Sequence, residues 1–421
     1  MQHYRSELES LQANGSAEPK ELSALRSKAF SRFTEMGFPT KKWEDWQFTD
    51  FSLFHKSHFR MTTAEDLQPA LDYPVEPFKD CYSIIILNGH FQQDRSNVPD
   101  GVTIRTLLDV FMDDELTDFL NAEENPFVAL NTSLMNSGLA IDIADQVQLS
   151  RPIHYQFITT GLKDNIMNHP RLLIRMGKNS SAEFIEHYKG DTPSLYWNNC
   201  VTISELSENS ILNHNRIQED TSYHVGNMEY HLQKDAILNS TIFNQGTELY
   251  RGDIRINFYG RNATAKLNGL SLMKDNQHMD IRVIVDHKQP HCNSSQFFKY
   301  ILDDKASGVF NGKIVVREKS HKTDSSQSNK NLLLSKNASM HSNPQLEIYT
   351  DDVRCTHGSS TGQLSEDALY YLRSRGIETA FAQRLMVEGF AAEILANIKD
   401  EGTAAYLNKK LTSWLESLEN G

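Results

Sequence analysis

The sequence predicts a mainly β protein whose β region is flanked by α-helical N- and C-terminal regions. Apolar residues recur at helical spacing in the first 60 residues and again after residue 365. Between residues 80 and 350, short β-prone runs alternate with Asn, Gly, Ser and Asp, and no helix of ordinary length interrupts residues 170–350. We therefore expect a helical region over residues 1–75, a β core over 76–350 and a second helical region over 351–421.

The N-terminal region has two recognisable features. A helix is indicated by apolar residues at positions 22, 25, 29, 30, 33 and 36, and Gly37 follows as a C-terminal stop. The aromatic segment 43–49 comes next, and we expect it to pack the helices onto the main body.

The β region contains at least eight candidate strands. A Ser- and Asn-rich stretch, residues 320–330, is instead expected to be an exposed loop. The candidate strands are residues 83–87, 171–176, 201–204, 237–243, 254–259, 281–285, 314–316 and 346–349.

A weak internal repeat runs through this region. Residues 209–213, 235–239 and 262–268 each begin with a polar turn residue and end in Asn, and residues 305–311 repeat the form later. The first three are spaced by about 26 residues, which is in the range of stacked repeats. One coil of a β-solenoid explains this spacing, but a sandwich or barrel with similar hairpin turns explains it equally well.

The C-terminal region predicts three amphipathic helices. Ser365 is placed to cap the first, Arg373 and Arg375 lie in its last turn, and Gly376 ends it. Apolar side chains mark the second helix at 381, 385, 390, 394 and 398, and the third at 407, 411, 414, 415 and 418.

The strongest candidate for a metal-binding site lies between the β region and these helices. Cys355 and His357 are two residues apart, so in an extended segment both side chains point to the same side. Thiolate with imidazole suits iron, zinc or copper(I). Two ligands do not close a coordination shell, so a partner would have to supply the rest. The alternative is a buried Cys beside a surface or hydrogen-bonded His.

Other histidines are weaker candidates. His287 and His291 have the HxxxH spacing, but Pro290 would break a helix between them, and we expect a turn there. His278, His321 and His341 are expected to be surface or hydrogen-bonding groups.

Composition excludes several classes of function. The net charge of −13 argues against nucleic acid or an anionic membrane as the main partner. Four scattered cysteines, no apolar leader and no long apolar run predict a soluble cytoplasmic protein. The segment 308–314 lacks the spacing of a phosphate-binding loop, so we expect no ATP hydrolysis, and no catalytic residue is assigned.

Residues 345–377, which contain Cys355-Thr356-His357-Gly358, resemble the SufB/SufD scaffold family of iron–sulfur cluster assembly. Residues 308–314, 322–324 and 329–335 are similar to that family in order and spacing, and Trp46-x-Phe48-Thr49 is similar to its N-terminal aromatic motif. The strong resemblance covers about 280–400. The Cys-x-His-Gly form is that of the SufD branch, whereas the SufB branch has a Glu-His-Glu-Ala-Thr-Thr-Ser type of run.

The resemblance implies a right-handed parallel β-helix core and a non-enzymatic scaffold role in a SufBCD-type complex. It implies that His357, with Cys355 beside it, faces a SufB-like partner and helps to hold a transient iron–sulfur cluster, with none bound stably by the isolated chain. A SufC-like ATPase would dock on the C-terminal region and drive its motion, and an open solenoid edge would form a heterodimer or a homodimer. The docking residues so implied are Tyr370, Tyr371, Leu372, Arg373, Arg375 and Gly376.

Two other functions remain as alternatives. A β-solenoid polysaccharide lyase would require an export signal and acidic calcium ligands. A free-standing zinc protein would use Cys355, His357, His287 and His291.

Overall fold

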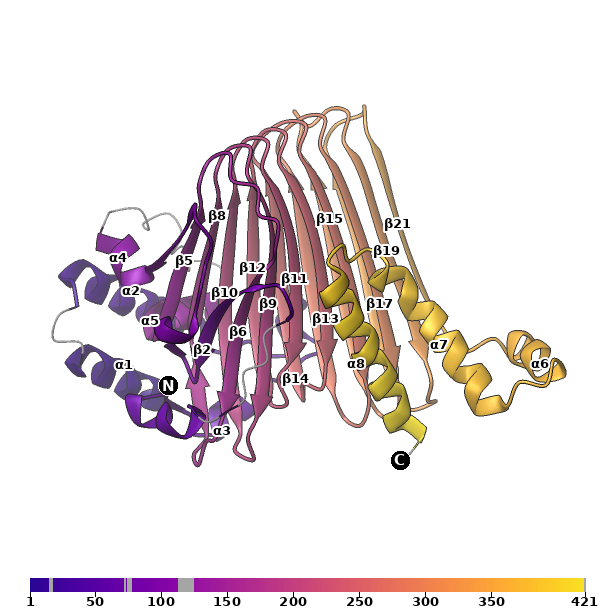
Figure 1. Ribbon diagram of the computed structural model, residues 1–421, viewed down its shortest axis with the longest axis horizontal. Coiled ribbons are helices and arrows are strands. Elements are labelled where there is room, and N and C mark those ends of the chain that lie inside the picture. Colours follow the sequence, from indigo (N-terminus) through magenta and orange to yellow (C-terminus); the bar gives the residue numbers. More distant parts are fainter. Residues whose placement is uncertain (15–17, 72, 74–77, 113–124, 420–421) are drawn as a thin grey trace.

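A computed structural model describes residues 1–14, 18–71, 73, 78–112 and 125–419 of the chain. Within these residues, 21 strands form two sheets of 11 and 10 strands, here called sheet A and sheet B. Helices flank the sheets at both ends of the chain (Figure 1). None of the described helices combines the length and apolar character needed to cross a bilayer.

The chain alternates between the two sheets, and almost all neighbouring strands are parallel. Among the strands of the described residues, only β2–β3 and β4–β5 pair antiparallel. Sheet A comprises β1 Arg60–Met61, β4 Val102–Thr106, β5 Ser137–Ile143, β7 Ile166–Asn168, β8 Pro170–Met176, β10 Tyr196–Leu206, β12 Tyr223–Leu232, β14 Leu249–Phe258, β16 His278–His287, β18 Ser307–Val316 and β20 Ser339–Ile348. Sheet B comprises β2 Tyr82–Leu87, β3 His90–Phe91, β6 Ile153–Thr160, β9 Ser181–Asp191, β11 Ile211–Glu219, β13 Ile237–Gln245, β15 Thr264–Met273, β17 Asn293–Leu302, β19 Asp324–Leu333 and β21 Arg354–Gly362.

This alternation confirms the β-solenoid and excludes the sandwich and the barrel, which the repeat alone did not separate. Each coil contributes one strand to each sheet, and the next coil adds its strands in parallel register. Parallel neighbours require such crossovers, whereas hairpin-built sandwiches pair antiparallel strands.

The weak sequence repeat marks one corner of the coil. Asn209, Asp235 and Asn262 adopt φ of 59°, 58° and 61°, a left-handed conformation that Asn and Asp tolerate better than most residues. The Asn209 N–H donates to the Lys234 carbonyl of the next coil at 3.0 Å, and the other corners continue this ladder. The later echo at 305–311 follows the left-handed Asp304 between β17 and β18, so it belongs to the opposite corner.

The three largest apolar clusters among the described residues join the layers. The largest fills the space between the sheets and includes Ile141, Leu238, Ile281 and Phe310. A second, rich in aromatic rings, packs the N-terminal segments onto the outer face of sheet A. A third packs α7 Thr379–Leu395 and α8 Glu401–Glu419 onto the outer face of sheet B, where Figure 1 shows both helices crossing the later strands.

The N-terminal helices cover the outer face of sheet A beside the first coils, and we call this end of the solenoid the closed end. They are α1 Gln2–Asn14, α2 Lys20–Met36, α3 Leu53–Lys56, α4 Leu107–Met112 and α5 Pro126–Leu134. Gly37 ends α2 with φ of 70°, as its position in the sequence predicted. The aromatic segment packs as expected, because Trp46 is buried and the Arg251 guanidinium lies 4.0 Å from the centre of its ring.

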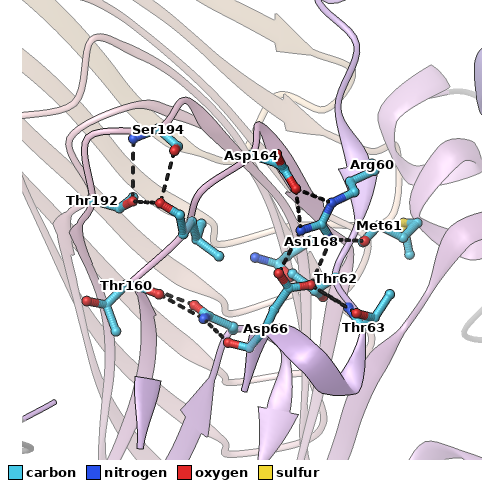
Figure 2. A network of polar contacts seen from close by, with 12 residues as sticks. Arg60, Met61, Thr62, Thr63, Asp66, Thr160, Asp164, Asn168, Thr192 and Ser194 are labelled. Carbon is cyan, nitrogen blue, oxygen red and sulfur yellow. Dashed lines mark hydrogen bonds and ion pairs between the residues drawn. The ribbon is translucent and has the colours of Figure 1, made fainter. Parts of the chain in front are cut away.

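Polar contacts reinforce this closed end (Figure 2). Arg60 donates to both carboxylate oxygens of Asp66 at 2.7 Å and also to Asp164 at 3.1 Å. Asn88 donates to the backbone oxygens of Asp66 and Thr160, both at 2.8 Å. These bonds tie the segment after α3 to the first coils.

Two expectations about the later coils differ from the structure. Residues 320–330, expected to be an exposed loop, largely form β19 and its preceding turn. The boundary expected at 351 falls before β21 Arg354–Gly362, which completes the last coil, and the helices begin only at α6 Glu366–Ser374. Both strands carry polar residues on both faces, so the apolar alternation that identifies a strand is missing.

Candidate functional site at the open end of the solenoid

Cys355 and His357 lie on β21, the last strand of sheet B. The register pairs Cys355 with Ser325 and His357 with Gln327 on β19. Ser325 and Gln327 are buried inside the solenoid, and in-register residues of parallel strands point to the same side. Cys355 and His357 therefore both point toward the interior at its last coil, and they lie on the same side of the strand, as the two-residue spacing predicted.

In the part of the chain that the structure describes, no further coil covers this end, so inward-pointing groups remain accessible there. His357 is exposed and Cys355 is half-buried. Burial raises the pKa of the Cys355 thiol, and the nearby Asp324 raises it further. The thiol is thus kept protonated at neutral pH, whereas the imidazole is available to a ligand or a neighbouring chain.

Hydroxyl and amide groups surround the two residues. Ser359 on β21 donates to the Ser342 hydroxyl of β20 at 2.8 Å, which joins the last strands of the two sheets. We call the opening between β20 and β21 the mouth of the solenoid. Asn331 donates to the Thr361 hydroxyl at 3.1 Å. The mouth is therefore polar, unlike the apolar cluster deeper between the sheets.

The two sheets end in edges of different character. On β20, the N–H of Ser339 donates to the carbonyl of Ala306 on β18. The main-chain N–H groups of alternate residues, starting from Met340, therefore point away from β18. Pro344 is one of these and has no N–H to offer. On β21, the N–H of Arg354 donates to Thr323, so those of Cys355, His357, Ser359 and Thr361 face the open side. Sheet B therefore presents an uninterrupted row of free donors, and sheet A does not.

Helix α6 presents an apolar surface away from the solenoid. Ser365 caps it by accepting from the Ala368 N–H at 3.3 Å, and Gly376 follows with φ of 84°, as the sequence predicted. No residue of α6 is buried. Tyr370 and Tyr371 are 75% and 58% exposed, and Phe381 on α7 is 53% exposed. The expected docking residues Leu372, Arg373, Arg375 and Gly376 lie on the same helix or directly after it, and each is at least partly exposed.

The remaining histidines do not join this site. His287 is buried and its Nε2 lies 2.9 Å from the Ser294 hydroxyl, while residues 288–292 form a turn between strands as predicted. His278 contacts Thr49 and Ser307, and His321 contacts Thr350. His341 stacks on Phe48 at 4.1 Å. Across the described residues, no group of three or more His, Cys, Asp or Glu side chains is placed to hold a metal, so the four-residue zinc site is not assembled.

Sequence reasoning missed Gln327, the register neighbour of His357. It lies in the stretch that was expected to be a loop, and only the coil length brings it beside the imidazole. Its Ser-rich surroundings gave no signal for a buried inward-facing residue.

Comparison with known proteins covers nearly the whole chain. The family described as "SUF system FeS cluster assembly, SufBD core domain" matches residues 157–390, and the SufBD protein N-terminal region matches residues 1–155. The resemblance therefore extends well beyond the part around 280–400 where the sequence motifs were strongest.

Individual relatives agree with this assignment. The chain is 29% identical over 392 residues to the iron–sulfur cluster assembly protein SufD of Escherichia coli, covering 92% of this chain and 91% of that protein. It is 29% identical over 416 residues to a SufBD family protein of Synechocystis, covering 90% and 92% of the two chains. It is 22% identical over 419 residues to SufD of Bacillus subtilis, covering 95% and 94%. The chain belongs to the SufBD family of iron–sulfur cluster assembly, as the Cys-x-His-Gly segment and its flanks indicated.

Proposed function

We propose that this chain is a non-catalytic scaffold subunit of an iron–sulfur cluster assembly complex, and that His357 supplies a ligand to a cluster formed at the seam with a SufB-like partner. One observation carries the proposal. His357 is an exposed, inward-pointing imidazole on the strand that ends sheet B with free main-chain donors. A partner strand that paired with β21 would bring its own side chains next to this imidazole.

The same arrangement explains why the chain needs a partner. Cys355 and His357 are two ligands at most, and a thiol with a raised pKa is a weak one. Soft thiolates and imidazoles from a second chain would complete the coordination shell of iron. We therefore assign His357 as the ligand and Cys355 as its neighbour, with no stable cluster on the isolated chain.

Energy for assembly would come from an ATPase subunit rather than from this chain. Residues 308–314 lie in β18, and a central strand offers no loop in which amides could surround a phosphate. The exposed tyrosines of α6 are suited to bind a SufC-like ATPase, because aromatic side chains dominate the free energy of many interfaces. Helix α7 would pass the motion to sheet B, where Lys299 binds Glu393 at 2.9 Å.

The names of the relatives favour this role over the polysaccharide lyase. Those compared above are all cluster assembly or SufBD family proteins.

The experiment is a His357→Ala variant co-purified with SufB-like and SufC-like partners, followed by anaerobic iron and sulfide analysis. The complex is expected to form as in the wild type, and its iron and sulfide content to fall to near background. His341→Ala is the matched control, since this imidazole is also exposed in the last coil but points outward from β20. Wild-type iron and sulfide content in the His357→Ala complex would reject the ligand role.

A further inference from the structure

The inner face of the last coils carries two buried glutamine side chains without hydrogen-bond partners among the described residues. Gln296 on β17 is 2% exposed and Gln327 on β19 is 3% exposed. The oxygen and the nitrogen of both amides are unpaired. A buried amide without partners loses its hydrogen bonds to water and gains none in the protein, which destabilises the fold. Such groups in a folded protein therefore require an explanation.

The register places both amides in a column that ends at His357. Gln296 pairs with Gln327, and Gln327 pairs with His357. Strands in a sheet lie about 4.8 Å apart, so an amide one strand away is within side-chain reach of whatever the imidazole binds. The amide of Gln327 also fills the space above Gly312 on β18, where an added Cβ would lie 1.5 Å from Nε2. The side chain thus crosses the interior instead of lying along the sheet surface.

We propose that Gln327 and His357 together bind a hydrated divalent first-row metal ion at the mouth of the solenoid. This inference rests on the proposed function, in which iron is the cargo that must be captured before a cluster forms. An imidazole nitrogen and a carboxamide oxygen are both ligands for such ions, and the amide N–H₂ of Gln327 donates to a water of the hydration shell. Gln296 continues the polar lining one coil further in.

The small number of protein ligands accounts for the weak affinity that we expect for the ion. Two protein ligands leave most coordination positions to water, so the ion binds weakly and exchanges readily. A partner at the β21 edge would replace some of these waters with its own side chains. The unpaired amide of Gln327 is then explained, because it is satisfied by the ion and its hydration shell.

The test is an anaerobic titration of the full-length chain with cobalt(II), a spectroscopic substitute for iron(II), followed by its visible absorption. Wild-type protein is expected to bind one ion weakly. Gln327→Leu and His357→Ala should each weaken the affinity by about tenfold. Gln327→Glu should strengthen it, because a carboxylate of the same shape is a better oxygen ligand. A purely structural role for Gln327 would not give opposite effects for Leu and Glu.

Gln345→Leu is the matched control, because Gln345 pairs with Lys313 and lies on the outward side of β20. Its cobalt affinity should equal that of the wild type, and thermal unfolding verifies that each variant is folded. Absence of cobalt binding, or unchanged affinity in both Gln327 variants, would overturn the inference. The proposed function would survive that result if His357→Ala still abolished cluster assembly in the complex.

Discussion

The two ends of the solenoid are built in opposite ways from the same coil. At the closed end, N-terminal helices cover the outer face of sheet A, aromatic rings fill the contact, and the ion pairs of Figure 2 tie the covering segment to the first coils. At the open end, Phe48 of the N-terminal segment stacks on His341 of β20, but no further coil among the described residues covers β20 and β21, and the interior beside them is polar. The closed end satisfies its own polar groups, whereas those at the open end are left to water or to whatever binds there.

The largest expected contrast between the two ends is in packing. Trp197 on β10 is fully buried, and its ring centre lies 4.4 Å from that of Phe54. Trp197→Ala should lower the free energy of unfolding by about 3–5 kcal/mol, because the surrounding rings cannot fill the cavity. Tyr349→Ala at the open end is the comparison, since that side chain is 56% exposed. Its effect should stay within about 0.5 kcal/mol. Denaturant unfolding measures both, and similar losses would refute the contrast.

The ion pair at the closed end has a smaller effect that depends on pH. Burial alone would raise the pKa of Asp66, but the hydrogen bonds from Arg60 and Thr63 outweigh it and hold the pKa below the ordinary 3.8. Asp66→Asn should lower the free energy of unfolding by about 1–2 kcal/mol, since water screens the exposed part of Arg60. The difference from the wild type should be constant above pH 3.8 and shrink as the pH falls below it.

Glu35→Gln provides the control for this measurement. Glu35 accepts from Arg32 at 3.2 Å, but both side chains are largely exposed. The change should therefore cost no more than about 0.5 kcal/mol at any pH. A difference between Asp66→Asn and wild type that stays unchanged in acid would mean that the carboxylate charge does not stabilise the fold.

The same contrast explains which parts of the fold the sequence predicted. The C-terminal helices were predictable because Ser365, Gly376 and the apolar stripes of the second and third helices are local signals. The left-handed Asn and Asp corners were visible as a weak repeat, but their meaning depended on parallel pairing between coils, which no local pattern states.

The open end was harder to predict for the same physical reason that makes it a candidate site. The inward residues Ser325, Gln327 and Asn329 of β19 are polar, so the strand lacked the alternation of apolar residues by which strands are recognised. Cys355 and His357 were identified because they are only two residues apart in the sequence. Gln327 was not, because its position beside His357 depends on the length of one whole coil.

The last prediction concerns the main chain of the open edge. Since the N–H of Ser359 faces away from β19 and that of Ser360 faces toward it, proline at these neighbouring positions should have different effects. The reference is Ser359→Ala, which also lacks the hydroxyl that bonds Ser342. Relative to it, Ser359→Pro should leave thermal unfolding nearly unchanged but remove one donor from the partner-facing edge. The affinity for a SufB-like chain should fall about tenfold, or about 1.4 kcal/mol. Ser360→Pro should instead break the ladder to β19, which amide hydrogen exchange would detect as faster exchange in β21. Wild-type affinity in Ser359→Pro would mean that the partner contacts side chains at the mouth and does not extend sheet B, and the open end would then be a binding surface without being a pairing edge.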